Sequence, residues 1–303
     1  METQHDIVIN NKRGVQYKFS VSRKFTIIRG DSATGKTTLF QMISDAESSH
    51  MMGINISCDV PVKPLHYADY VVQLKEQSGC IIMLDEDFED ILSGTFAKAA
   101  IASDNCFIII TRHAMPAIPY SYKEIYKIKA SGKFHSLEPV YEEYDKFVNN
   151  NKVVTEDEDS GFEYFKHFFG DKVITSRGNS NLSKFIDDGT TLIGDGSAIG
   201  PYIQDLLLGR ADLFLPESFE YMMLNLPMFD NKEVREILNA PEKYITTEYA
   251  SWERYFTDLL IRITNNTPAQ YTKSKLNECF YKQCCFKQTK CQFFTSDDKK
   301  FFD

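Results

Sequence analysis

The residues best suited to chemistry form a glycine-rich turn that ends in a lysine and two threonines. Residues 29 to 40 read RGDSATGKTTLF and follow the apolar run Phe25 to Ile28. Backbone N–H groups of such a turn point at phosphate oxygens, and the next helix adds its positive N-terminal end. In the spacing GxxxxGKT, the lysine reaches the β- and γ-phosphates and the first threonine ligates Mg²⁺. We therefore predict a phosphate-binding site formed by Gly30, Asp31, Ser32, Ala33, Thr34, Gly35, Lys36, Thr37 and Thr38.

Two further apolar runs end in polar residues that suit the same chemistry. The run CIIMLDE, residues 80 to 86, supplies Asp85 as a Mg²⁺ ligand and Glu86 as a candidate general base. Both acids would also fit the simpler role of capping the next helix. The run Phe107 to Thr111 leads into Arg112 and His113, and His113 is a candidate sensor of the γ-phosphate. A lone histidine after a strand is also common as a structural residue.

These runs must be positioned by a sheet. Apolar strands alternate with amphipathic helices in the first half of the chain, which indicates a parallel sheet covered on both faces. We expect strands at 6–10, 15–22, 25–28, 54–58, 80–84 and 107–111, helices from the glycine-rich turn onward, at 67–76 and at 91–102, and a hairpin at 123–140 turning at 131–132.

Residues 5 to 140 resemble the ABC-type ATPase family. The resemblance rests on paired N-terminal strands before FTIIRGDSATGKTTL, on IIMLDE, and on FIIITRH. It implies a P-loop ATPase domain that binds ATP and Mg²⁺. No LSGGQ-like signature precedes the strand that ends at Asp85, so we expect hydrolysis to be slow or to need residues of a partner.

Acidic residues also follow two apolar runs in the second half. The run Lys152 to Thr155 leads into the acids 156–159, and TTLIGDGSAIG, residues 190 to 200, is an apolar run ending in Asp195. Carboxylates at the ends of adjacent parallel strands converge on one sheet edge, where they suit divalent metals. A run of four acids is also typical of a solvated turn. The polar turn 178–181 either faces the same edge or only caps a helix.

The order of these motifs resembles the Toprim fold of topoisomerases, primases and overcoming-lysogenization-defect nucleases. Glu156 matches the glutamate that ends the first Toprim strand, and Asp195 opens the position of the DxD motif, where Ser197 replaces the second aspartate. Glu217 or Glu220, in LFLPESFEYMML, resembles the acidic helix start of some relatives. The resemblance implies catalytic, metal-binding Glu156 and Asp195, with Glu217 as a further ligand.

Composition sets the remaining expectations. The net charge of -9 argues against coating nucleic acid over the whole surface but permits a local basic groove. The absence of a long apolar run predicts a cytoplasmic protein without a membrane partner. The last 25 residues space four cysteines as C-x4-C-C-x5-C, without the short hooks of zinc sites, which favours reduced thiols. Lysines and aromatic residues there suit either nucleic-acid binding or a packed helix.

We therefore predict an α/β protein with two domains. Residues 1–145 would form a P-loop ATPase domain with a parallel sheet and added N-terminal strands. Residues 152–303 would form a smaller Toprim-like α/β domain with a helical C-terminal region. The predicted function is ATP-dependent control of a Mg²⁺-dependent nuclease or DNA- or RNA-binding domain, as in bacterial or phage defence proteins. The alternatives are an ATP-dependent switch that binds a protein partner or a second copy of the chain, and a small-molecule kinase.

Overall fold

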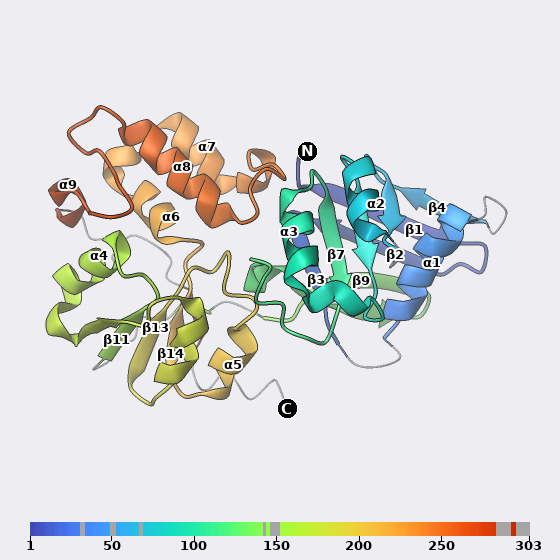
Figure 1. Ribbon diagram of the computed structural model, residues 1–303, viewed down its shortest axis with the longest axis horizontal. Helices are drawn as coiled ribbons and strands as arrows, with labels where there is room; N and C mark the ends of the chain where they lie inside the picture. The colour runs from blue at the N-terminus through green and yellow to red at the C-terminus, as the bar shows by residue number, and fades with distance from the viewer. Residues whose placement is uncertain are drawn as a thin grey trace. The chain divides into compact units, whose positions relative to one another are not determined.

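The computed structural model describes residues 1–30, 34–48, 53–66, 69–141, 144–145, 152–282 and 292–294 (Figure 1). The chain forms two compact units. Unit 1 comprises residues 1–141 and 240–250, and unit 2 comprises residues 142–239 and 251–303. In the described part of the chain, no helix has the length and apolar character needed to cross a membrane.

The segment 240–250 belongs to unit 1, whereas the sequence-based division at 145–152 assigns it to the second domain. Its contacts with the start of the chain explain the difference. The Thr247 N–H donates to the Met1 carbonyl at 2.9 Å, and Glu2 forms a β-bridge with Thr246. The buried Lys24 ammonium donates to the Thr247 carbonyl at 2.7 Å and also to the carbonyls of Ile101 and Ser103. These polar contacts leave little trace in sequence periodicity.

Unit 1 is built on a mixed sheet. Among the described residues, its strands are β1 (His5–Asn11), β2 (Gln16–Val21), β3 (Phe25–Ile28), β4 (Ile54–Ser57), β5 (Val62–Pro64), β6 (Ile81–Leu84), β7 (Cys106–Ile110), β8 (Ile125–Ser131) and β9 (Phe134–Pro139). Their order is β4-β1-β2-β9-β8-β3-β7-β6-β5. The series β8-β3-β7-β6-β5 is parallel throughout, while β4-β1-β2 and the β8-β9 hairpin pair antiparallel.

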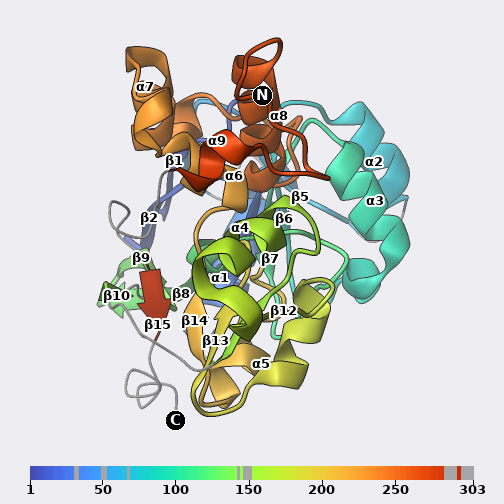
Figure 2. The ribbon, with the colours of Figure 1, turned by 90° about the vertical axis from the view of Figure 1, so that its left-hand side faces the viewer.

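Helices bury both faces of the parallel part of this sheet. They are α1 (Lys36–Ser48), α2 (Tyr70–Glu76) and α3 (Gly94–Ala102), with 3-10 turns at Glu89–Leu92, Tyr122–Glu124 and Pro241–Lys243. In β7, Ile108 packs into one cluster with Leu39 of α1, whereas Phe107 faces Phe96 of α3 at 6.3 Å between ring centroids. The helices α2 and α3 contact each other and lie side by side in Figure 2. The fully apolar strands β6 and β7 are therefore buried on both sides, as expected for a covered parallel sheet.

Two features of unit 1 differ from the sequence-based expectation. The strand β4 pairs antiparallel with β1 at the sheet edge instead of joining the parallel series. The strand β5 was not predicted at all, because it has only three residues and ends in Pro64. Proline lacks the N–H needed in a central strand but fits at a sheet edge, which is where β5 lies.

Unit 2 contains a second sheet, parallel at its centre. Its strands in the described part are β10 (Tyr144–Asp145), β11 (Lys152–Thr155), β12 (Val173–Thr175), β13 (Thr190–Ile193), β14 (Asp212–Phe214) and β15 (Gln292–Phe294), in the order β10-β15-β14-β13-β11-β12. The strands β14, β13, β11 and β12 run parallel, and β15 pairs antiparallel with β14 and β10. The carboxyl ends of the four parallel strands therefore meet at one edge.

Helices of unit 2 carry further residues to that edge. They are α4 (Ser160–Phe169), α5 (Ile203–Leu208), α6 (Phe219–Leu224), α7 (Lys232–Asn239), α8 (Trp252–Thr264) and α9 (Glu278–Tyr281), with 3-10 turns at Gly170–Lys172, Asn179–Phe185 and Pro227–Phe229. The helices α6 and α8 pack together, with Tyr221 and Phe256 at 4.9 Å between ring centroids (Figure 1). The polar turn expected at 178–181 begins a 3-10 helix, and the three-residue strand β14 interrupts the region expected to be helical.

Candidate functional site

The glycine-rich turn of unit 1 adopts a conformation that requires its glycines. Gly30 and Gly35 have φ of 128° and 97°, in the left-handed region that disfavours other residues. A Cβ on Gly35 would also lie 2.8 Å from the hydroxyl oxygen of Tyr17, which donates to the Gly35 carbonyl. The predicted residues Asp31, Ser32 and Ala33 lie outside the described part of the chain. Sequence reasoning missed the contribution of Tyr17 because it comes from β2.

Lys36 opens α1, as expected for a phosphate-binding turn. Its side chain is buried, and its ammonium donates to the Gly30 carbonyl at 2.7 Å and to the Thr34 hydroxyl at 3.3 Å. The ammonium is therefore directed into the turn. Thr37 and Thr38, in the first turn of α1, are exposed.

The polar ends of β6 and β7 lie at the same sheet edge as this turn. Because β7 lies between β3 and β6 and all three are parallel, residues 111–113 stand between the turn and Asp85. Burial raises the pKa of Asp85. A hydrogen bond from the Glu86 N–H at 2.8 Å acts in the opposite direction but is the weaker effect. Glu86 forms an ion pair with Arg112 at 3.1 Å. His113 is exposed, and its N–H donates to the hydroxyl of the buried Thr111 at 3.0 Å.

In unit 2, the acids singled out in the sequence come together at the carboxyl edge of the parallel strands. Glu156 follows β11 and its N–H donates to the Ile193 carbonyl of β13 at 2.9 Å. Asp195 follows β13 and is buried; one of its carboxylate oxygens accepts from the Phe219 N–H at 3.1 Å. Both side chains line a cavity of about 370 Å³.

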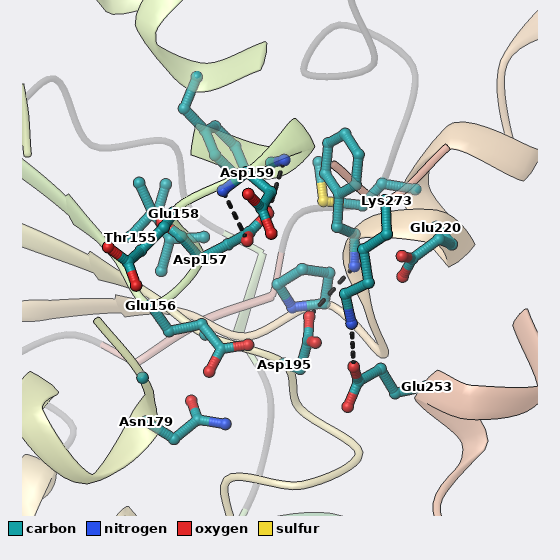
Figure 3. A pocket seen from close by; sticks show the side chains of 18 of the residues that line it. Thr155, Glu156, Asp157, Glu158, Asp159, Asn179, Asp195, Glu220, Glu253 and Lys273 are labelled. Carbon is teal, nitrogen blue, oxygen red and sulfur yellow. Dashed lines mark hydrogen bonds and ion pairs between the residues drawn. The ribbon is translucent and has the colours of Figure 1, made fainter. Parts of the chain in front are cut away.

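The cavity is strongly acidic (Figure 3). Seven acidic and two basic side chains line it: Glu156, Asp157, Glu158, Asp159, Asp195, Glu220, Glu253, Arg177 and Lys273. The carboxylates of Glu156, Asp195, Glu220 and Glu253 converge in Figure 3, with the Lys273 ammonium 2.8 Å from Glu253. Arg177 is paired with Glu158 at 3.2 Å. The arrangement therefore has a surplus of negative charge around a small space.

The proton affinities of the inner carboxylates reflect this crowding. Burial, then the negative charge of Glu253, raises the pKa of Glu156 to about 7. Burial, then the charge of Glu156, raises the pKa of Asp195 well above its ordinary value. Burial also raises the pKa of Glu220, against the opposing charge of Lys273. For Lys273, burial acts to lower the pKa, but the charge of Glu253 and its hydrogen bond outweigh burial and raise it. Like charges held together out of water are the cause in each carboxylate.

Several side chains hold this arrangement in place without belonging to its centre. The buried Tyr271 hydroxyl donates to Glu220 at 2.8 Å and also contacts the Ser160 hydroxyl. Asp157 accepts from the N–H groups of Asp159 and Gly161, so this acid of the run caps the start of α4. Asp157 therefore both caps this helix and lines the cavity.

Ser197 has a role that the sequence does not reveal. Its hydroxyl accepts from the Glu253 N–H at 3.2 Å, and its own N–H donates to the Glu217 carbonyl at 3.1 Å. Ser197 therefore fixes the first turn of α8, which carries Glu253 to the cavity.

The sequence predicted only some of the residues that line this cavity. Gly178 and Asn179 line the cavity, as one of the two interpretations of their turn requires. Glu220 lines it, whereas Glu217 does not. Glu253 and Lys273 were missed because they lie some 60 to 120 residues along the chain from Glu156 and Asp195, in α8 and in the loop after it. An acid at a helix start and a lysine in a lysine-rich stretch give no distinct signal.

Comparison with protein-family models, with curated proteins and with solved structures returned no match for this chain.

Proposed function

We propose that unit 2 is a divalent-metal-dependent nuclease whose activity is controlled by ATP bound with Mg²⁺ in unit 1. The observation that carries the proposal is the convergence of four carboxylates, three of them with raised pKa, at the carboxyl edge of a parallel sheet. Burying like charges together is costly without a counter-charge. Divalent cations of the Mg²⁺ type prefer oxygen ligands and would supply that charge.

The donor set fits Mg²⁺ or Mn²⁺. Glu156, Asp195 and Glu253 offer carboxylates, and the Asn179 side-chain oxygen is buried with no hydrogen-bond partner among the described residues. A buried orphan oxygen beside carboxylates fits an additional oxygen ligand. When bound, such ions activate water and stabilise charge on a phosphoryl group.

Several residues at the carboxyl edge of the unit 2 sheet have properties that suit the binding of a metal ion and a phosphodiester. Glu156 and Asp195 interact directly, and a proton held by this pair at neutral pH would be released when a cation binds. Lys273 holds Glu253 by a 2.8 Å contact. Arg177 stands at the rim with φ of 62°, a strained conformation for a residue other than glycine. Its guanidinium is suited to contact a backbone phosphate of nucleic acid.

The nucleotide half of the proposal rests on the turn from Gly30 to Thr37. Its two glycines at positive φ, the ammonium directed into the turn and the N-terminus of α1 together form an anion site. Asp85 would hold Mg²⁺ with Thr37, and Glu86 would act on water once released from Arg112. The Glu86 to Arg112 pair supports slow hydrolysis until a partner or substrate rearranges it.

Cleavage assays test the nuclease directly. Full-length protein is incubated with supercoiled plasmid, labelled single-stranded DNA and labelled RNA, with Mg²⁺ or Mn²⁺ and with or without ATP. We expect cleavage that Glu156→Gln and Asp195→Asn each abolish. Asp188→Asn is the matched control, because Asp188 is an exposed acid of unit 2 that does not line the cavity.

A switch without nuclease activity is the second candidate, and Ser197 favours it. The motif position of a second aspartate is taken by a hydroxyl that binds backbone. Absence of cleavage under every condition, with Mn²⁺ still bound and lost in Asp195→Asn, would support a metal-binding switch. Absence of both cleavage and metal binding would refute the proposal for unit 2.

A further inference from the structure

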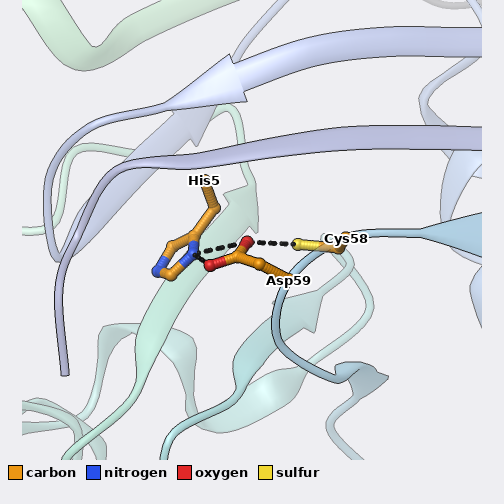
Figure 4. A group of neighbouring side chains, drawn as sticks. All are labelled: His5, Cys58 and Asp59. Carbon is orange, nitrogen blue, oxygen red and sulfur yellow. Dashed lines mark hydrogen bonds and ion pairs between the residues drawn. The ribbon is translucent and has the colours of Figure 1, made fainter.

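Unit 1 contains a second group of metal-ligating side chains, remote from its nucleotide-binding turn in sequence. His5 opens β1, and Cys58 and Asp59 directly follow β4, which pairs with β1. In these three residues one ligand atom each lies within 4.8 Å of the others, and no other such group of three occurs among the residues described. Figure 4 shows the three side chains turned toward one another.

The hydrogen bonds of His5 call for a cation at its Nδ1 atom. The buried imidazole places Nε2 2.9 Å from the Glu2 carbonyl and Nδ1 2.9 Å from both carboxylate oxygens of Asp59. Both ring nitrogens thus face oxygen acceptors, but a neutral imidazole has only one N–H. If Nε2–H donates to the Glu2 carbonyl, the Nδ1 lone pair faces a carboxylate. A second proton or a metal ion is then needed between them.

Cys58 distinguishes these two possibilities. Its sulfur lies 3.3 Å from an Asp59 carboxylate oxygen, on the opposite side of that carboxylate from His5 (Figure 4). An imidazolium would need only the carboxylate, whereas nitrogen, sulfur and oxygen together form the donor set of zinc. An imidazole whose other nitrogen donates to a backbone carbonyl is also the usual arrangement of a metal-bound histidine.

We propose that His5, Cys58 and Asp59 bind a zinc ion through Nδ1, Sγ and a carboxylate oxygen. Ligand atoms of a tetrahedral zinc site lie about 3.3 to 3.8 Å apart. The present atoms lie within 4.8 Å of one another, so binding requires the side chains of Cys58 and Asp59 to turn toward a common point. The group borders a hollow of about 470 Å³ that Glu2 and Glu242 also line. The fourth position therefore faces this hollow, where water or a further carboxylate completes the coordination.

The ion would join the start of β1 to the turn between β4 and β5. It would act as a clip on the edge of the unit 1 sheet, and it is independent of the nuclease proposed for unit 2. Because zinc would bind the folded arrangement more tightly than the unfolded chain, it should raise the thermal stability of unit 1, and this increase should grow with the logarithm of the zinc concentration relative to Kd.

Cobalt substitution provides the test, since Co²⁺ bound to a thiolate gives a charge-transfer band. The full chain also carries Cys279, Cys284, Cys285 and Cys291, so these are first replaced by serine to remove competing thiols. We expect this protein to bind one thiolate-linked Co²⁺ per chain, seen as the thiolate band and separate from any Co²⁺ on the carboxylates of unit 2, and Zn²⁺ to abolish the band. His5→Gln, Cys58→Ser and Asp59→Asn should each lose the band or weaken binding at least about tenfold.

His66→Gln is the matched control. His66 also contacts a carboxylate, that of Glu47 at 3.1 Å, but it is exposed and has no cysteine beside it in the described part. It should leave the cobalt spectrum unchanged. A spectrum without a thiolate band, or a band that persists in Cys58→Ser, would overturn the proposal. Circular dichroism verifies folding, and if His5→Gln does not fold, Cys58→Ser and Asp59→Asn decide the matter.

Discussion

The two candidate sites have the same place in their sheets but opposite electrostatic designs. In unit 1, the carboxyl edge of β3, β7 and β6 presents a backbone turn, one ammonium and one buried carboxylate, from Asp85. In unit 2, the carboxyl edge of β12, β11, β13 and β14 presents a cluster of carboxylates with a single ammonium held against one of them. The first edge suits anions, and the second suits cations.

The difference shows how each site is assembled. The proposed anion site would use consecutive backbone groups, so a single segment from Gly30 to Thr37 would contain nearly all of it. The cation site needs side-chain oxygens from several directions, so it draws on segments from Glu156 to Lys273.

The largest expected effect follows from removing the ammonium of unit 1. Lys36→Ala deletes charge-assisted contacts to phosphate worth about 3 kcal/mol, which corresponds to roughly a hundredfold loss of ATP affinity. A titration with a fluorescent ATP analogue measures it. Lys98→Ala, on the exposed side of α3, should bind as the wild type does. Equal affinity in the two variants would show that the turn does not bind the phosphates.

The second prediction concerns pH and unit 2 in metal-free buffer. The pKa of Glu156 is about 7 in the folded chain and 4.5 ordinarily, so the folded state binds the proton more tightly. Its contribution to stability is complete below pH 4.5 and is lost as the pH rises through 7. The shift corresponds to about 3 kcal/mol in the free energy of unfolding. Trp252, the single tryptophan, is buried at the start of α8 and reports unfolding of unit 2 by fluorescence.

Glu156→Gln is the control for this pH dependence. The amide cannot ionise, so the decline of the free energy of unfolding between pH 4.5 and 7 should become shallower. Mg²⁺ should restore stability at pH 8 in the wild type and not in the variant. An identical pH profile in both proteins would mean that the carboxylates of this edge do not crowd one another.

A site built from one segment can be predicted from the sequence more completely than a site built from distant segments. The position of Asp85 at the end of β6 and the β8-β9 hairpin could be predicted because each signal lies within one short segment. Glu156 and Asp195 could be assigned to one sheet edge because each follows an apolar strand, and their roles stay predictions. Glu253 could not be found, because it reaches the cavity through the packing of α8 on α6, a tertiary contact without a periodic signature. The sequence also did not predict that His5 and Cys58 lie together, since strand pairing joins them.

The third prediction tests whether the Ser197 hydroxyl holds Glu253 in position at the cavity. Ser197→Ala removes the hydrogen bond to the Glu253 N–H and leaves the start of α8 less well fixed. A loss of about 1 kcal/mol should weaken Mn²⁺ binding about fivefold, measured by Trp252 fluorescence. Ser251→Ala is a close control, because Ser251 is the N-cap residue of α8 but makes no side-chain capping bond. An equal loss of Mn²⁺ affinity in the two variants would mean that a less stable start of α8 causes the loss, and not the displacement of Glu253.

The smallest effect is expected at Tyr17, which supports the turn of unit 1 from outside. Tyr17→Phe deletes the 2.8 Å hydrogen bond to the Gly35 carbonyl but keeps the ring stacked on His135 at 4.5 Å. The turn should keep its shape while losing about 1 kcal/mol or less, so ATP affinity should fall only a few-fold. Tyr70→Phe, whose ring packs on Phe88 and Phe96, serves as the control in the same titration. A hundredfold loss in Tyr17→Phe would show that unit 1, like unit 2, depends on side chains brought from distant segments, and the contrast between the two sites would fail.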